Sequence, residues 1–151
     1  MLHAGDPAPA FSAVDQYGTV QTLQDYHGKW LLLYFYPKDD TPGCTKEACG
    51  FRDNFSVLGD RVTILGVSKD SAESHTKFAE KYTLPFPLLA DPDQLLIAAY
   101  GVDGVTLPKR VSFLLDDQGR IAKIYDKVDC DVHAAQVLED VRHIQSMSSR
   151  A

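Results

Sequence analysis

The sequence predicts an α/β fold in which a mixed central sheet is covered by helices on both faces. Three observations lead to this fold class. Residues 30–36 form a continuously apolar run and residues 62–67 a second one, which is typical of strands buried on both faces. A helical pattern follows each of these runs, and a hairpin with a terminal helix closes the chain. Helix-separated strands of this kind pack as one layered sheet.

The first predicted element is a short hairpin over residues 10–23, with its turn at residues 15–18. The buried strand 30–36 follows. A helix is then expected over residues 44–58, because apolar residues recur there at three- and four-residue spacing. These residues are Ala48, Phe51, Phe55 and Leu58.

Capping residues predict the starts of two more helices after the strand 62–67. Asp70 and Glu73 resemble a capping box, which predicts a helix that runs to residue 82. Asp91 is a good N-cap, and Pro92 suits a first helical position. Together they predict the start of a helix ahead of residues 95–100.

The C-terminal part is predicted to be a hairpin followed by a helix. Residues 110–115 and 121–125 flank a polar, glycine-containing turn at 116–119. Residues 132–144 carry an apolar stripe with helical spacing, formed by Val137, Leu138, Val141 and Ile144.

Length and charge limit the classes of function. With 151 residues and no linker or repeat, the chain is expected to form a single domain over 1–151. The net charge of -6, without a basic run, argues against a nucleic-acid partner. No apolar run approaches the roughly 20 residues of a membrane span, and the N-terminus lacks the features of a signal peptide, so we expect no membrane association and a cytoplasmic protein.

Three cysteines are too few for a disulfide framework, so their positions must indicate their chemistry. Cys44 follows a buried strand and a Pro/Gly loop, at the predicted start of a helix. Unpaired backbone N–H groups and the helix dipole favour a thiolate there, which is the nucleophile of redox chemistry. The alternatives are that Cys44 is an inert small residue and that Cys49 is a helix core residue.

Pro37, Thr41 and Cys44 match the Pro-x-x-x-Thr-x-x-Cys signature of the peroxiredoxins. The segments 41–45 and 47–53 resemble the bacterioferritin-comigratory, or Q-type, subfamily. The similarity extends over nearly the whole chain, from Gly5 near the start to His133 in the last predicted helix.

This resemblance implies a thioredoxin-like fold and the reduction of hydrogen peroxide and organic hydroperoxides. It implies a thioredoxin or a similar thiol reductant as partner, no metal, haem or flavin cofactor, and a monomer. Cys44 would attack the peroxide, Thr41 would hydrogen-bond to it and to the substrate, and Pro37 would shield the site from water. Arg110 matches the family arginine, and its guanidinium would stabilise the developing negative charge.

By the same resemblance, Cys49 would resolve the oxidised Cys44 through an intramolecular disulfide. Cys130 is expected to be a bystander, because its two acidic neighbours disfavour a thiolate. His133 is interpreted as a structural or solvated residue. The acidic residues near Cys44, which are Asp39, Asp40 and Glu47, are interpreted as residues that favour the helix dipole.

Two other classes of function stay open. Cys44, Cys49, Cys130 and His133 could supply the four ligands of a zinc site, although the spacing from Cys44 to Cys49 is one residue longer than usual. A thiol-disulfide oxidoreductase is the second alternative, although such enzymes usually carry Cys-x-x-Cys.

Overall fold

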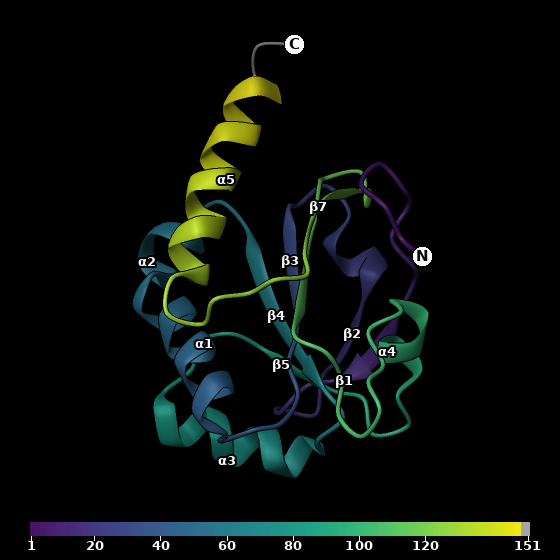
Figure 1. Cartoon of the computed structure of the whole chain (residues 1–151), viewed down its shortest axis with the longest axis vertical. Helices are drawn as coiled ribbons and strands as arrows, with labels where there is room; N and C mark the ends of the chain where they lie inside the picture. The colour runs from purple at the N-terminus through teal and green to yellow at the C-terminus, as the bar shows by residue number, and fades with distance from the viewer. Residues whose placement is uncertain (149–151) are drawn as a thin grey trace.

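A computed structural model describes residues 1–148 of the chain, so residues 149–151 of the predicted domain lie outside the described part (Figure 1). The strands are β1 (Ser12–Val14), β2 (Val20–Thr22), β3 (Leu31–Phe35), β4 (Thr63–Ser68), β5 (Leu88–Ala90), β6 (Val111–Leu115) and β7 (Ile121–Tyr125). The helices are the 3-10 helix η1 (Leu23–Tyr26) and the α-helices α1 (Pro42–Asp53), α2 (Phe55–Leu58), α3 (Ala72–Tyr82), α4 (Leu95–Ala99) and α5 (His133–Ser148).

The seven strands form one mixed sheet in the order β2-β1-β5-β4-β3-β6-β7. The central strands β3, β4 and β5 are parallel, whereas β6 pairs with β3 in the antiparallel sense and β7 continues the antiparallel edge. Leu33 in the middle of β3 lies opposite Leu65 on one side and Phe113 on the other. The predicted mixed central sheet is therefore confirmed.

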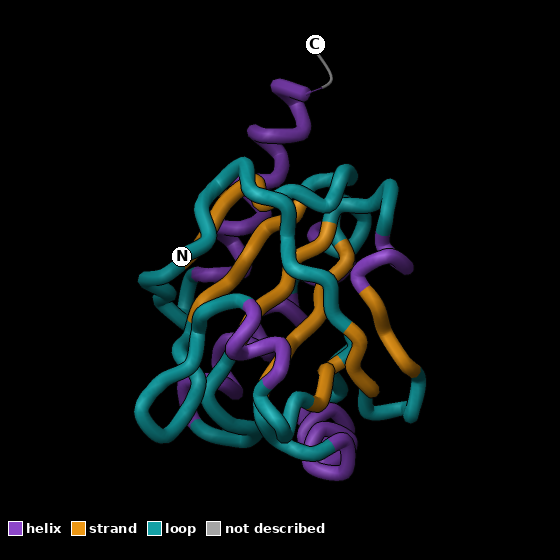
Figure 2. Tube along the Cα trace, turned by 90° about the vertical axis from the view of Figure 1, so that its right-hand side faces the viewer, coloured by secondary structure: helices purple, strands orange, loops and turns teal. Residues whose placement is uncertain are grey.

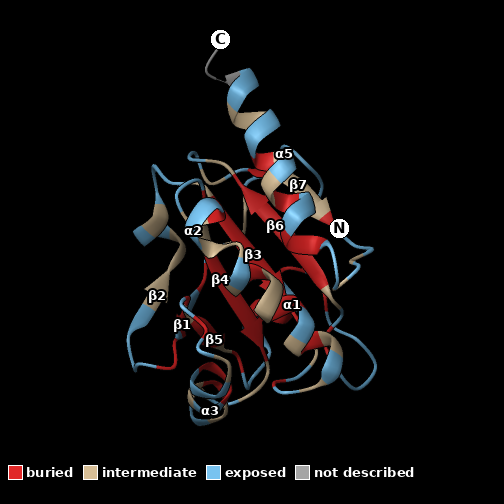
Figure 3. Cartoon of the chain, turned by 90° about the vertical axis from the view of Figure 1, so that its left-hand side faces the viewer, coloured by how far each residue is buried: buried red, intermediate tan, exposed pale blue. Residues whose placement is uncertain are grey.

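All five residues of β3 are buried, because the strand contributes side chains to a separate apolar core on each face of the sheet. Side chains alternate between the faces of a strand, so Leu32 and Tyr34 enter one core and Leu33 and Phe35 enter the other. The first core is covered by α1, α2, α3 and α5; in Figure 3, α1 and α2 lie in front of the sheet and α3 lies at its lower end. The second is covered by α4, η1 and connecting loops (Figure 2).

The helix predicted over residues 44–58 is two helices in the structure, and it begins earlier than predicted. Thr41 is the N-cap of α1 and Pro42 its first residue, where a proline loses no hydrogen bond. The helix ends at Asn54, whose side-chain amide donates a 2.8 Å hydrogen bond to the carbonyl of Gly50. The backbone N–H of Asn54 donates to the same carbonyl, so Asn54 closes α1 with two hydrogen bonds before the short α2 begins.

The predicted start of α3 at Asp70 is wrong by one residue. Ser71 is the N-cap, and its hydroxyl accepts a 3.1 Å hydrogen bond from the backbone N–H of Ser74. The carboxylate of Asp70 instead accepts hydrogen bonds from the backbone N–H of Asp39 and the hydroxyl of Ser68. Asp70 therefore anchors the loop that follows β3 rather than the helix.

The predicted start of α4 is wrong, because the N-cap is Gln94 and not Asp91, and the helix begins at Leu95 and not at Pro92. The Asp91 carboxylate accepts hydrogen bonds from the backbone N–H groups of Leu95, Leu96 and Ile97. Strand β5 was not predicted, because three residues are too few to show a periodic pattern. The two predicted hairpins are confirmed by the pairing of β1 with β2 and of β6 with β7, and the terminal helix by α5.

Within residues 1–148, none of the helices combines the length and the apolar character that a bilayer crossing requires.

Candidate active site

Cys44 lies in the first turn of α1, directly after the loop that leaves the carboxyl end of β3. Its side chain is buried in the core between the sheet and α1. The loop before it is held in place at Asp40, which adopts a positive φ of 55°. The Asp40 carboxylate accepts hydrogen bonds of 2.8 Å from Lys81 and from Tyr82 at the end of α3. The thiol therefore sits on a fixed helix terminus.

Arg110 brings the second functional group to Cys44 from just before the start of β6, the strand that pairs with β3. The register of β3 and β6 pairs Phe35 with Val111, so Arg110 lies just beyond the carboxyl end of β3. Its Nη2 donates a hydrogen bond to Sγ of Cys44 over 3.3 Å. A guanidinium at this distance stabilises negative charge on the sulfur and on atoms that react with it.

Glu47 holds the same guanidinium from the opposite side. It lies three residues after Cys44, so both side chains project from one face of α1. Glu47 Oε1 accepts a 2.8 Å hydrogen bond from Nη1 of Arg110, and its side chain is 0% exposed. Its Oε2 finds no hydrogen-bond partner among residues 1–148.

Burial changes the acid–base behaviour of this pair. Burial raises the pKa of Glu47 from 4.5 to about 7, and the positive charge of Arg110 only partly offsets that effect. Burial alone would lower the pKa of Arg110, but the charges of Glu47 and Cys44 outweigh it and raise the net value. Arg110 therefore stays charged at every relevant pH, and Glu47 can change its charge close to neutrality.

Thr41 and Pro37 belong to the same loop, but the Thr41 hydroxyl is engaged differently from the expectation. It donates a 2.8 Å hydrogen bond to the backbone carbonyl of Lys38. A hydroxyl has one proton, so in this arrangement it can offer Cys44 or a bound peroxide only its lone pairs. Pro37 is half-buried between the buried Tyr36 and the exposed Lys38.

A buried polar network, which the sequence did not suggest, supports this loop from beneath. Asp39 Oδ2 lies 2.7 Å from Nδ1 of His75, and Nε2 of His75 donates a 2.8 Å hydrogen bond to the carbonyl of Leu89. Asp39 also accepts hydrogen bonds from the hydroxyls of Tyr36 and Ser74. The network connects the loop to α3 and β5, so Asp39 acts in the loop and not at the helix start.

The other two cysteines lie in different elements of the structure: Cys49 in α1 and Cys130 between β7 and α5. Cys49 is half-buried on α1, beyond the turn that carries Cys44. Cys130 lies in the connection from β7 to α5, and its Sγ would be 3.7 Å from a Cβ built on Gly43. All three thiols are free. The structure therefore places Cys130, expected to be a bystander, beside the residue that precedes Cys44.

Both of these thiols are weaker acids than an ordinary cysteine. Burial raises the pKa of Cys49, and Arg52 and Asp53 add smaller opposing effects. Burial also raises the pKa of Cys130, where Arg110 opposes the shift. The negative charges of Glu47, Cys44 and Asp129 raise the Cys130 value further. The predicted effect of the acidic neighbour Asp129 thus has the right sign, but burial is the larger cause.

The interpretation of Glu47 as a residue that favours the helix dipole is wrong, because it lies beyond the first turn of α1 and pairs with Arg110. A carboxylate three residues after a candidate thiolate shares its helix face, and only a cation from elsewhere makes that placement tolerable. For His75 no sequence signal was available, whereas His133 was interpreted from the sequence as a structural or solvated residue. His133 is buried, its Nε2 lies 2.8 Å from the Ser112 hydroxyl, and burial lowers its pKa to about 4.

A metal centre is not supported by the geometry. In the described part of the chain, no group of three or more His, Cys, Asp and Glu side chains is placed to hold a metal ion. The four residues considered as zinc ligands do not form such a group. His133 is directed towards β6, where its ring contacts Ser112.

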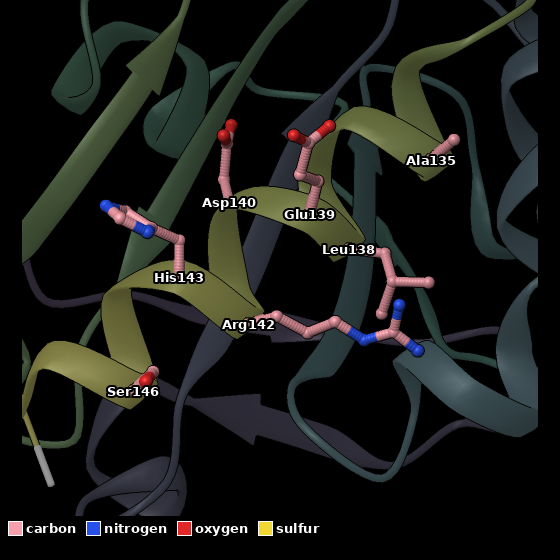
Figure 4. A pocket seen from close by; sticks show the side chains of 7 residues that line it. All are labelled: Ala135, Leu138, Glu139, Asp140, Arg142, His143 and Ser146. Atoms are coloured by element: carbon pink, nitrogen blue, oxygen red, sulfur yellow. The ribbon is translucent and has the colours of Figure 1, made fainter.

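A hollow along α5 lies apart from the thiol chemistry (Figure 4). Its lining contains none of the three cysteines and neither Thr41 nor Arg110. It is lined by Ala135, Leu138, Glu139, Asp140, Arg142, His143 and Ser146.

Comparison with known proteins agrees with this site. Residues 4–124 match the profile of the AhpC/TSA family. The chain is 46% identical to a putative peroxiredoxin bcp of Coxiella burnetii over 91% of this chain and 97% of that protein. It is 42% identical to peroxiredoxin Bcp of Escherichia coli K12, over 91% of this chain and 94% of that protein.

Solved structures agree as well. A mutant of PrxQ from Xylella fastidiosa superimposes with a TM-score of 0.92 at 33% identity, over 96% of this chain and 98% of that one. The bacterioferritin comigratory protein of Xanthomonas campestris, studied for its alkyl peroxide reduction activity, superimposes with a TM-score of 0.87 at 34% identity, over 93% and 98% of the two chains. The predicted thioredoxin-like fold is thus confirmed. The chain, with its buried thiol beside an arginine, belongs to the AhpC/TSA family and is a Bcp-type, or Q-type, peroxiredoxin, which is a thiol-dependent peroxidase.

Proposed function

We propose that this peroxiredoxin reduces hydrogen peroxide and organic hydroperoxides at Cys44, forms an intramolecular Cys44–Cys49 disulfide, and is recycled by a thioredoxin-type reductant. The hydrogen bond from Arg110 to Sγ of Cys44 is the observation that carries the proposal. The alkyl peroxide reduction activity named for the Xanthomonas campestris relative supports organic hydroperoxides as substrates.

In the first step, the Cys44 thiolate attacks the terminal oxygen of the hydroperoxide. The S–O bond forms while the O–O bond breaks, and the leaving oxygen takes a proton to become an alcohol or water. Negative charge grows on that oxygen, and Arg110 stands where a fixed cation stabilises it without reorganisation. Glu47 holds the guanidinium in position, and Thr41 offers lone pairs to a protonated peroxide oxygen.

In the second step, the Cys49 thiolate attacks the sulfur of the Cys44 sulfenic acid, and the hydroxyl leaves as water after it takes a proton. Both cysteines belong to α1. Residues five apart on an ideal helix have Cα atoms roughly 8.6 Å apart, whereas a disulfide requires about 4.4–6.8 Å. The first turns of α1 must therefore unwind before the disulfide can close.

Unwinding requires free energy, because it breaks the hydrogen bonds that Arg110 donates to Cys44 and Glu47 in the reduced helix. Gly50 lowers this cost, since glycine destabilises a helix interior by about 1 kcal/mol relative to alanine. The reductant then reduces the Cys44–Cys49 disulfide by thiol exchange, which returns both thiols and lets the helix reform.

We further propose that the protein acts as a monomer in the cytoplasm. Light scattering of the reduced and oxidised forms tests the first point, and a mass of two chains in either state would contradict it. Fractionation of cells tests the second point.

The central experiment compares single-turnover peroxide consumption by two matched variants, Cys44→Ser and Cys49→Ser. Cys44→Ser should consume no peroxide, because it lacks the nucleophile. Cys49→Ser should consume one equivalent of peroxide for each chain, because it keeps the nucleophile. It cannot form the Cys44–Cys49 disulfide. Normal consumption by Cys44→Ser would overturn the proposal. Reduction of a model disulfide by the reduced wild type in preference to peroxide would favour a thiol-disulfide oxidoreductase instead.

A further inference from the structure

A small volume beside Gly43 is shared by Arg110 and Cys130. A Cβ built on Gly43 would lie 3.0 Å from Nη2 of Arg110 and 3.7 Å from Sγ of Cys130. The same Nη2 donates to Sγ of Cys44 over 3.3 Å. Glycine leaves this volume open, so the guanidinium that contacts Cys44 and the thiol of Cys130 both border it.

The segment that carries Cys130 is anchored to α1 and to the sheet. Lys46 Nζ lies 3.5 Å from Oδ1 of Asp131, the residue after Cys130. The Ala134 methyl is within ordinary contact distance of a Cβ built on Gly50. His133 contacts Ser112 in β6, two residues after Arg110. The position of Cys130 near the start of α1 therefore follows from the packing of α5.

The electrostatic environment of Cys130 is that of the active site. After burial, which is the largest cause of its raised pKa, the next three effects come from Arg110, Glu47 and Cys44. The thiol thus responds to the charge of Cys44, and loss of that charge in a sulfenic acid removes one of the effects that disfavour the Cys130 thiolate.

Cys49 and Cys130 differ in what must move before they reach Cys44. Cys49 shares a helix with Cys44, so that helix must melt. Cys130 belongs to the connection between β7 and α5, outside α1, and its thiol borders the space beside Gly43, so its approach to Cys44 does not require melting of a helix that both cysteines share. The Lys46–Asp131 pair that holds it is exposed and contributes little stability.

We propose that Cys130 is a second resolving thiol, which forms a Cys44–Cys130 disulfide when Cys49 does not reach the oxidised Cys44. The inference rests on the proposed peroxidase chemistry of Cys44. The Cys130 sulfur attacks the sulfur of the Cys44 sulfenic acid, the S–S bond forms, the S–O bond breaks, and the hydroxyl leaves as water with the thiol proton. The peroxide already consumed is the only oxidant, and the same thiol reductant returns both cysteines.

The test compares Cys49→Ser with Cys49→Ser/Cys130→Ser after one equivalent of hydrogen peroxide. Each sample is alkylated, digested and analysed by mass spectrometry, with dimedone added in parallel to trap sulfenic acid. Cys49→Ser should give near-complete Cys44–Cys130 disulfide within single chains at a rate independent of protein concentration. The double variant should give none of it, keep a Cys44 sulfenic acid, and convert to sulfinic acid with excess peroxide.

Failure of this inference differs from failure of the proposed function. If Cys49→Ser keeps a dimedone-reactive Cys44 and an alkylatable Cys130, as the double variant does, Cys130 does not resolve and the inference is overturned. A disulfide only between two chains also overturns it. In either case the wild type still forms its Cys44–Cys49 disulfide. If peroxide oxidises none of the wild-type cysteines, the proposed function itself fails.

Discussion

Nη1 of Arg110 donates a 2.8 Å hydrogen bond to Oε1 of Glu47, a carboxylate with no exposed side-chain surface that lies 63 residues earlier in the chain. The pair orients the guanidinium so that its other terminal nitrogen reaches Cys44. A buried carboxylate is costly unless it is paired, so its position depends on the arginine as much as the arginine depends on it. Much of the expected behaviour of the enzyme follows from this relationship.

Arg110→Lys should slow the first attack on peroxide by about a hundredfold, because loss of a well-placed donor to the developing charge costs about 10²–10³ in rate. Lysine keeps the positive charge, but a single ammonium cannot donate in the planar fork that serves Glu47 and Cys44 together. The second-order rate constant of the reduced protein with hydrogen peroxide measures the effect. Lys109→Arg, at the exposed neighbouring position, is the matched control and should react as the wild type does. Equal rates for Arg110→Lys and its control would contradict the role of the fork.

Glu47→Gln should remove part of the pH dependence of stability. The folded protein raises the pKa of Glu47 from 4.5 to about 7, so in that window it holds a proton that the unfolded chain has lost. The free energy of unfolding of the wild type should therefore decrease as pH rises through the window, by at most about 3 kcal/mol, and the loss should level off above it. Urea denaturation at several pH values measures this, and parallel profiles for the wild type and Glu47→Gln would argue against it.

Gly50→Ala should slow disulfide formation about fivefold while it leaves the first attack on peroxide unchanged, because about 1 kcal/mol of added helix stability must be overcome during unwinding. The change is sterically possible, since the new Cβ would lie 3.7 Å from Cβ of Ala134. Rapid-quench mass spectrometry separates the two steps. Hydrogen exchange should show amide protection lost over α1 in the wild-type disulfide form. Equal protection in both redox states would show that the disulfide closes without unwinding.

Formation of the Cys44–Cys49 disulfide should accelerate with pH. Burial raises the pKa of Cys49 in the helix, and after unwinding the ordinary cysteine pKa of about 8.5 still leaves only a small fraction of attacking thiolate near neutrality. The rate should rise by about tenfold for each pH unit below that pKa, if unwinding is not limiting. The measurement uses Cys130→Ser protein, in which Cys49 is the only available resolving thiol, and a pH jump after sulfenic acid has formed at low pH. A rate independent of pH would show that unwinding, and not the thiolate fraction, limits the step.

Much of the fold was determined by local sequence. The continuous apolar run of β3 predicts burial on both faces of the strand from its own residues. The turn residues between β6 and β7 likewise predict their hairpin without reference to the rest of the chain. The position of Cys44 after this strand, with Pro37 and Thr41 at the signature spacing, predicted the reactive thiol. Such features depend on residues close in sequence, which is why periodicity and motif spacing reveal them.

The tertiary structure decided which groups meet at that thiol. Arg110 reaches Cys44 and Glu47 only because β6 pairs with β3 in one register, and no local pattern encodes the pairing of strands this far apart. The Asp39–His75 contact likewise joins residues 36 positions apart that only the packed chain brings together. Cys130 gives the clearest contrast: its acidic neighbours in sequence argued for a bystander, whereas the packing of α5 places it beside Gly43, because long-range packing determines the surroundings of a side chain.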